Sequence, residues 1–268
     1  MKVAGMKIIL QHGWGFDSHM WSDWSDTLQR ILPGSSVIVG ERGYFGDRSV
    51  PSLATYLPDS KREPLLVICH SLGLHLVSHS MLQQCEGLVI IGSFQKFHGG
   101  TDREQKLSRT KIRRMLSRLP TDPVSVLRDF HANCGFELIP GSAGVPPASD
   151  PSSARFQRES DPNIDYYAPI NTDLLLSDLE ILDQCDLDVQ LLRQIPKVQI
   201  LHGTQDMIVP LARALDLQLS LPNSSLAVLE SAQHSLPTVY MDWCVDQVLN
   251  TFAPNAFAPA HARGSKNR

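Results

Sequence analysis

The stretch VICHSLG, residues 67–73, decides the fold. An apolar strand over residues 65–69 runs into Ser71, Gly73 follows two places later, and an apolar-rich helix comes next. This order is typical of a nucleophile elbow, a sharp strand-to-helix turn with a serine in a strained position at its tip. Cys69 stands where the usual G-x-S-x-G pattern has its first glycine. The alternative is a buried strand followed by an ordinary serine helix cap.

The composition indicates one globular domain. The chain has 268 residues, of which 42% are hydrophobic and 19% charged, and its net charge of −4 suggests neither a nucleic-acid nor a membrane partner. The five cysteines are odd in number and lack CxxC spacing, which favours reduced thiols over disulfides or a zinc site. No apolar run has the length of a signal peptide or a membrane span. We therefore expect a cytoplasmic monomer.

Short apolar strands alternate with helices through most of the chain. Strands are expected at residues 6–11, 37–39, 65–69, 88–91, 198–201 and 226–229. Helices are expected over residues 20–31, through Leu74, Val77 and Met81, from Pro210, and from Pro237 to about residue 252, with a short helical piece at 52–57. This alternation predicts an α/β fold with a doubly wound, mostly parallel sheet, formed by residues 1–94 and 195–252.

The strand rhythm stops between residues 95 and 194. Residues 101–119, 122–134 and 172–185 read as helices, so we expect a helical lid over the mouth of the sheet. Within it, residues 140–162 are rich in Pro, Ser, Ala and Gly and are expected to form a mobile, non-catalytic insertion. A frayed tail is expected at 253–268.

Three side chains follow three strand ends in an order that suggests nucleophilic catalysis. A serine hydroxyl needs a base such as histidine, and an acid must hold that imidazole in the right tautomer. Ser71, Asp206 and His234 stand in the chain order of α/β-hydrolases, each just after a strand. Taken singly, a loop aspartate is usually a cap and a lone histidine is usually incidental. The ordered set of three predicts a catalytic triad.

The glycine-rich turn HGWG, residues 12–15, follows the first strand. An oxyanion formed by serine attack needs backbone N–H donors, for which we expect Leu72, after the serine, and Trp14 in this turn. The alternative for HGWG is a tight turn with a core tryptophan. His70 either lines the pocket or fills space. His75 and His79 are expected to pack, and neither a metal nor a cofactor is expected.

A strongly basic run lies in the first helix of the expected lid. Residues 96–118 hold eight basic residues against two acidic ones, on a chain that is acidic as a whole. A charge run of this kind is usually a solvated helix face. The other interpretation is a docking surface for an acidic partner, because such a surface steers and orients association.

Several motifs resemble the pimeloyl-[acyl-carrier protein] methyl ester esterases of biotin synthesis. They are HGWG, the elbow, LLLSDLEIL at 174–182, DL at 186–187 and HGTQDMIVP at 202–210. The resemblance covers most of residues 6–250. It departs at Cys69, at His70, where the best-known branch carries tryptophan, and at the insertion 140–162.

This resemblance implies an α/β-hydrolase fold with Ser71 as nucleophile, Asp206 as acid and His234 as base. It also implies that lid residues line the acyl channel, namely Phe130, His131, Ala132, Asn133 and Cys134. The acyl-carrier partner would dock on the basic lid residues Arg103, Lys106, Arg109, Lys111, Arg113 and Arg114.

The expected activity is a serine carboxylic-ester hydrolase of the EC 3.1.1 type, acting on the methyl ester of pimeloyl-[acyl-carrier protein] without a cofactor. The alternatives are a small-molecule carboxylesterase, a thioesterase or a carbon–carbon bond hydrolase with the same triad. A non-catalytic binding protein with this fold is a third reading, prompted by the imperfect elbow at Cys69.

Overall fold

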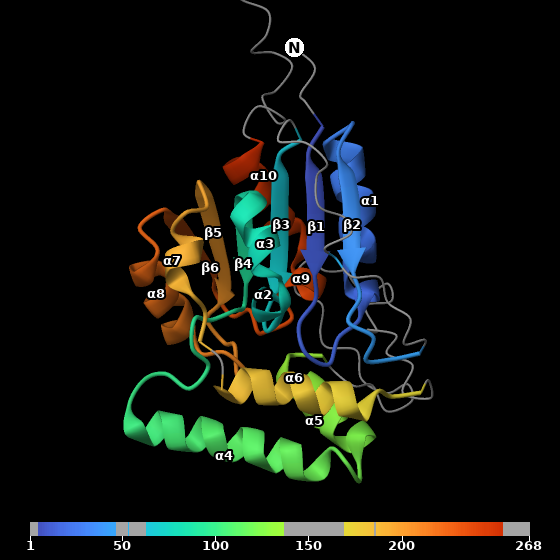
Figure 1. Ribbon diagram of the computed structural model, residues 1–268, viewed down its shortest axis with the longest axis vertical. Helices are drawn as coiled ribbons and strands as arrows, with labels where there is room; N and C mark the ends of the chain where they lie inside the picture. Colours follow the sequence, from blue (N-terminus) through green and yellow to red (C-terminus); the bar gives the residue numbers. More distant parts are fainter. Residues whose placement is uncertain (1–4, 47–52, 54–62, 137–168, 185, 254–268) are drawn as a thin grey trace, which may run out of the picture.

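A six-stranded, fully parallel sheet forms the centre of the molecule. The computed structural model describes residues 5–46, 53, 63–136, 169–184 and 186–253. The strand order is β2-β1-β3-β4-β5-β6 (Figure 1). The strands are β1 (Lys7–Gln11), β2 (Ser36–Gly40), β3 (Leu65–His70), β4 (Cys85–Ile91), β5 (Lys197–Gly203) and β6 (Ser224–Leu229). The predicted doubly wound sheet is confirmed.

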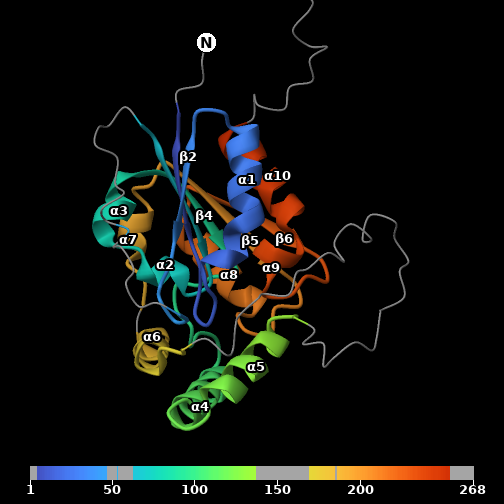
Figure 2. The ribbon, with the colours of Figure 1, turned by 90° about the vertical axis from the view of Figure 1, so that its right-hand side faces the viewer.

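Helices cover both faces of this sheet. One face carries the 3₁₀ helix η1 (Ser18–Trp21), α1 (Ser22–Ile31), α9 (Leu236–Val239) and α10 (Met241–Phe252); the other carries α2 (Gly73–Leu76), α3 (His79–Gln84), α7 (Val189–Leu192) and α8 (Leu211–Ser220) (Figure 2). Because neighbouring strand residues point to opposite faces, Leu66 and Ile68 join the first core, whereas Val67 and Cys69 join the second. Burial on both faces explains the continuous apolar run of β3.

Three further helices lie beyond the carboxyl ends of the strands (Figures 1 and 2). They are α4 (Asp102–Arg118), α5 (Pro123–Asn133) and α6 (Thr172–Gln184), within about two residues of the expected bounds. Each of the first two has an N-cap: Thr101 forms a capping box with Glu104, and Asp122 accepts from the Ser125 N–H. In the described ranges, no helix is both long and apolar enough to cross a membrane.

Two predicted helices are interrupted, so those predictions are wrong in detail. The helix expected through Leu74, Val77 and Met81 breaks at Val77, which is extended, because Ser78 caps a new helix by accepting from the Met81 N–H. The last helix is divided at Tyr240 into α9 and α10. Residues 140–162, most of 52–57 and 254–268 lie outside the described residues.

Candidate active site

The site lies where the strand order reverses. The chain forms β1, moves out to β2, and returns to β3 on the other side of β1, which is the point where α/β sheets bind ligands. Pairing of Gln11 with Cys69 places the two following turns side by side. A Cβ on Gly13 would lie only 2.8 Å from the Ser71 Cβ, and one on Gly73 would lie 2.7 Å from the His12 carbonyl oxygen. The glycines are therefore needed for this close approach.

Ser71 has the strained backbone that an elbow requires. Its φ is 53°, in the left-handed region that a residue with a side chain rarely adopts. The strain is held by two hydrogen bonds: the Ser71 N–H donates to the Ile91 carbonyl at 2.9 Å, and the Ser93 hydroxyl donates to the Ser71 carbonyl at 2.7 Å. The predicted elbow is present, and Cys69 is fully buried in the core behind it.

Ser71, His234 and Asp206 form a continuous hydrogen-bonded chain. The Ser71 Oγ lies 2.9 Å from the His234 Nε2, and the His234 Nδ1 lies 2.7 Å from the Asp206 Oδ2. The His234 ring is fully buried, and Ser71 is 4% exposed. With the carboxylate accepting from Nδ1–H, Nε2 is left as the acceptor that faces the hydroxyl. The serine can therefore pass its proton to this imidazole.

The Asp206 carboxylate is oriented by its surroundings. Its Oδ1 accepts from the backbone N–H groups of Ile208 at 2.9 Å and Val209 at 2.8 Å, which leaves Oδ2 for His234. Behind it, the buried His202 ring lies 3.6 Å from Oδ2 and contacts the Val209 carbonyl. Burial lowers the pKa of His202, so this ring is neutral at neutral pH. The orientation of the Asp206 carboxylate is thus fixed by the protein itself, without a bound substrate.

His70 is the last residue of β3 and packs against His234. Its Nε2 lies 3.0 Å from the His234 carbonyl oxygen and donates to it, and the two rings are 4.7 Å apart between centroids. Burial, followed by the neighbouring His234, lowers the pKa of His70 well below its usual value. His70 is therefore a neutral, fully buried packing residue that supports the His234 backbone. His75 also packs, with its Nε2 on the Phe94 carbonyl.

The two expected oxyanion donors lie next to the serine. Leu72 follows Ser71 at the start of α2, and Trp14 follows Gly13, where an added Cβ would lie 2.8 Å from the Ser71 Cβ. Within the described part of the chain, neither backbone N–H group has a hydrogen-bond acceptor. The Trp14 indole is buried and donates to the Leu175 carbonyl of α6 at 2.8 Å. Trp14 is thus a core residue whose backbone N–H is free to bind an anion.

The expected channel residues on α5 divide into two groups. Phe130 packs edge-on against Trp14 with ring centroids 4.9 Å apart, and the His131 Nε2 lies 2.8 Å from the Gly15 carbonyl oxygen. Cys134 is buried, with its carbonyl accepting from the Ser235 N–H. Ala132 and Asn133 are exposed, and neither makes a hydrogen bond to a triad residue in the described part of the chain. For these two, a role in lining the site has no support in the geometry.

The basic residues of α4 lie mainly on its outer face. Arg103, Lys106, Lys111, Arg113 and Arg114 are exposed and make no ion pair with a described residue. Arg109 is half-buried and lies 3.8 Å from Asp183 of α6. Five of the eight basic residues in the run thus lie on a solvated helix face and carry charge that no described acidic residue pairs with.

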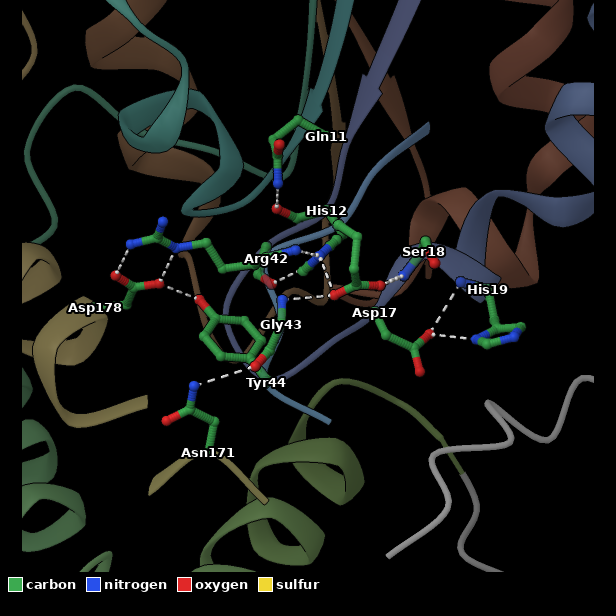
Figure 3. A network of polar contacts seen from close by, with 12 residues as sticks. Gln11, His12, Asp17, Ser18, His19, Arg42, Gly43, Tyr44, Asn171 and Asp178 are labelled. Carbon is green, nitrogen blue, oxygen red and sulfur yellow. Dashed lines mark hydrogen bonds and ion pairs between the residues drawn. The ribbon is translucent and has the colours of Figure 1, made fainter. Parts of the chain in front are cut away.

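Sequence reasoning gave no role to several residues that shape this site. Ser93 and His202 fix the nucleophile and the acid, and a buried set around Arg42, Tyr44 and Asp178 joins α6 to the loop at 41–46 (Figure 3). Ser93 and His202 offered only polarity at a strand end as a signal, and Asp178 offered only its place in the stretch 174–182. Among the described residues, no three His, Cys, Asp or Glu side chains gather in a way that could hold a metal ion.

Comparisons with known structures identify the class of fold. A bromoperoxidase from Bacillus anthracis is 18% identical with a TM-score of 0.67, covering 92% of this chain and 91% of that chain. An esterase from Exiguobacterium antarcticum (15%, TM-score 0.64) and an enol-lactonase from Burkholderia xenovorans LB400 (15%, TM-score 0.65) have the same coverage. The chain has the α/β-hydrolase fold.

A curated relative indicates a more specific resemblance than the fold alone. The chain is 25% identical over 246 residues to the pimeloyl-[acyl-carrier protein] methyl ester esterase of Vibrio atlanticus (strain LGP32), which covers 86% of this chain and 88% of the relative. No protein-family model matches the chain. The resemblance seen in the motifs is therefore supported over most of the sequence.

Proposed function

We propose that this protein is a serine carboxylic-ester hydrolase. One observation carries the proposal: the Ser71 Oγ lies 2.9 Å from the His234 Nε2, whose Nδ1 lies 2.7 Å from the Asp206 carboxylate. In the proposed reaction, His234 takes the Ser71 proton as the hydroxyl oxygen attacks the ester carbonyl. The imidazolium then returns a proton to the leaving alcohol, and the acyl group stays on the serine.

The backbone would stabilise the charge that forms in this step. In this proposal, the backbone N–H groups of Trp14 and Leu72 bind the oxyanion. Water, deprotonated by His234, then hydrolyses the acyl-serine and restores the free enzyme. The proposed cycle needs no cofactor.

The test is Ser71→Ala together with a fluorophosphonate, which labels an activated serine covalently. We expect wild-type protein to be labelled and to hydrolyse an aryl ester such as p-nitrophenyl butyrate. Ser71→Ala should be unlabelled, with kcat lower by about 10⁴-fold or more and circular dichroism unchanged. Turnover that survives the substitution would refute the nucleophile. A wild-type protein that neither reacts nor hydrolyses would favour a non-catalytic binding protein.

We further propose that the substrate is the methyl ester of pimeloyl-[acyl-carrier protein], hydrolysed in biotin biosynthesis. The support is the curated relative of that name and the exposed basic face of α4, which suits an acidic carrier. Mass spectrometry of products from a panel of carrier-linked and free methyl esters tests this. The proposal is wrong if the protein does not demethylate the carrier-linked ester or restore biotin-independent growth to a strain lacking that esterase.

The alternative is a hydrolase of small molecules with the same triad. Structures with this fold include an esterase and an enol-lactonase, so the fold does not select the substrate. Charge reversal at Arg109, Arg113 and Arg114 separates the two proposals. Carrier-linked turnover should fall by about tenfold or more while aryl-ester hydrolysis is unchanged. Equal effects on both substrates would favour the alternative.

A further inference from the structure

Asp178 carries a fully buried carboxylate on α6. Arg42 donates two parallel hydrogen bonds to it, from Nε to Oδ2 and from Nη2 to Oδ1, both at 2.7 Å. The Tyr44 hydroxyl donates a third, at 2.6 Å to Oδ2 (Figure 3). A buried carboxylate is stable only with such partners, so the three bonds hold α6 in one position against the loop at 41–46.

Backbone contacts extend this attachment to the start of α6. The Asn171 N–H donates to the Tyr44 carbonyl at 2.7 Å, and the Gly46 N–H donates to the Pro169 carbonyl at 3.0 Å. Phe45 and Ile170 form an isolated antiparallel bridge between the same two segments. Side-chain and backbone contacts therefore fix α6 to the loop along more than one of its turns.

The same loop holds the beginning of the turn at residues 12–15. The Arg42 N–H donates to the His12 Nε2 at 3.0 Å, which makes Nε2 an acceptor and places the ring proton on Nδ1. That Nδ1 lies 2.8 Å from the Gly13 carbonyl oxygen and donates to it. Glu41 stiffens the loop by accepting from the Ser18 and Gly43 N–H groups, each at 2.8 Å.

Helix α6 holds the other part of this turn. The Trp14 indole Nε1 donates to the Leu175 carbonyl at 2.8 Å, and Leu175 lies one helical turn before Asp178. A shift of α6 would therefore move the Trp14 ring, or break its hydrogen bond. The turn at residues 12–15 is thus held from two sides, by the loop at 41–46 and by α6, and Asp178 links that loop to α6.

We propose that Asp178 is a positioning residue for the ester hydrolysis proposed above, on which this inference rests. By fixing α6 against the loop at 41–46, it sets, through the Leu175 carbonyl, the place of Trp14 and of its backbone N–H. That N–H binds the oxyanion, which exists only in the transition state and the intermediate. The loss of Asp178 therefore lowers kcat and leaves KM nearly unchanged.

The experiment measures kcat and KM for p-nitrophenyl butyrate in Asp178→Asn, with active sites counted by fluorophosphonate labelling. We expect kcat per labelled site to fall by about tenfold or more, while KM stays within about threefold. A purely structural role would reduce the number of labelled sites or the Tm but not kcat per site. The matched control is Asp183→Asn, on the same helix.

Asp183 also attaches α6 to a neighbour, but not to the loop at 41–46. Its carboxylate lies 2.8 Å from the His98 Nε2 and 3.8 Å from Arg109. The Asp183→Asn variant should keep kcat per site within about twofold of wild type. An equal fall in this variant would show that general loosening of the lid, not Asp178, is responsible.

A second variant tests the route through Trp14. Trp14→Phe removes the indole donor and keeps an aromatic ring and the backbone N–H. If Asp178 acts through this contact, the double variant with Asp178→Asn should lose no more kcat than the stronger single variant. Losses that multiply would contradict the route.

A kcat per site within twofold of wild type in Asp178→Asn overturns the inference. If Asp178→Asn does not fold, Tyr44→Phe takes its place, because it removes one hydrogen bond and keeps the ring. We expect kcat per labelled site in Tyr44→Phe to fall by about threefold relative to wild type. An inactive and unlabelled wild type would overturn the proposed function and the inference with it, whereas an active wild type with unaffected variants overturns the inference alone.

Discussion

The nucleophile turn and helix α6 both contribute to the site, but different forces place them. The turn is fixed by close backbone approach: Gly13 and Gly73 leave no room for a methyl group beside Ser71 and His12. Helix α6 is fixed by charged and polar side chains, with Asp178 and its partners at the centre. Adding a methyl group at a close steric contact forces the surrounding atoms to move, so its cost is abrupt. Removing one hydrogen bond from a polar network weakens that network by degrees.

The largest expected effect comes from adding one methyl group to the turn. Gly13→Ala would place a Cβ 2.8 Å from the Ser71 Cβ and 3.0 Å from the His70 carbonyl oxygen, so the serine or the turn must shift. We expect kcat/KM for an aryl ester to fall by about 10²- to 10³-fold.

Gly34→Ala is the matched control for this change. Its φ of 95° is strained for alanine, but the added Cβ has open space, so stability should fall by about 1 kcal/mol without loss of activity. If Gly13→Ala keeps its activity as Gly34→Ala should, the turn can shift to accommodate the methyl group, and close backbone approach does not fix the position of Ser71.

The next effect concerns two neutral histidines, one just after the nucleophile and one on the neighbouring helix α5. Burial lowers the pKa of His75, in helix α2 after the nucleophile, and of His131, on α5, to about 4 each. Between pH 6.5 and 4 the unfolded chain binds protons that the folded chain excludes, so the free energy of unfolding falls as the pH falls. Each histidine should contribute a loss of about 3 kcal/mol at pH 4.

Chemical denaturation at several pH values measures this dependence. His75→Gln should reduce the pH slope of stability by about one proton over that range. His79→Gln, at an exposed position on α3, should leave it unchanged. A slope that is the same in wild type and His75→Gln would mean that the buried ring titrates normally.

The smallest effect is expected from an exposed ion pair between helices α4 and α5. Arg118 of α4 and Asp129 of α5 lie 2.8 Å apart, and the aspartate side chain is 61% exposed. We expect Asp129→Asn to change the unfolding free energy by less than about 1 kcal/mol and to leave kcat unchanged. A larger loss of unfolding free energy would show that the packing of α4 against α5 depends strongly on this one surface contact. Polar contacts would then not weaken by degrees, as proposed above for helix α6.

The sheet and the turn could be predicted because their signals are local. The run at 65–71 and the glycines at 13 and 73 act on neighbouring residues, and parallel pairing brings strand ends to one edge. The same logic brought Ser71, Asp206 and His234 within hydrogen-bond reach, although they span 163 residues. Their catalytic roles remain predictions.

The attachment of α6 could not be predicted, since it depends on pairing across 136 residues. Nothing near Asp178 in the sequence indicates that its carboxylate is buried, and the polar, glycine-containing stretch around Arg42, residues 41–46, gives no sign of its partner. The break at Val77 was missed because one serine cap outweighed a regular apolar spacing. A side chain's distant partner is decided by tertiary packing, which periodicity does not report.

The base comes from the loop after β6, a strand at the edge of the sheet. During synthesis, the ribosome releases the nucleophile turn long before residue 234, so an unfinished chain holds its serine without a proton acceptor. Opening of this edge strand in the finished protein would have the same effect, because the imidazole would leave while the elbow stayed folded. The position of the His234 imidazole therefore depends on β6, which in the described part of the chain pairs with β5 alone.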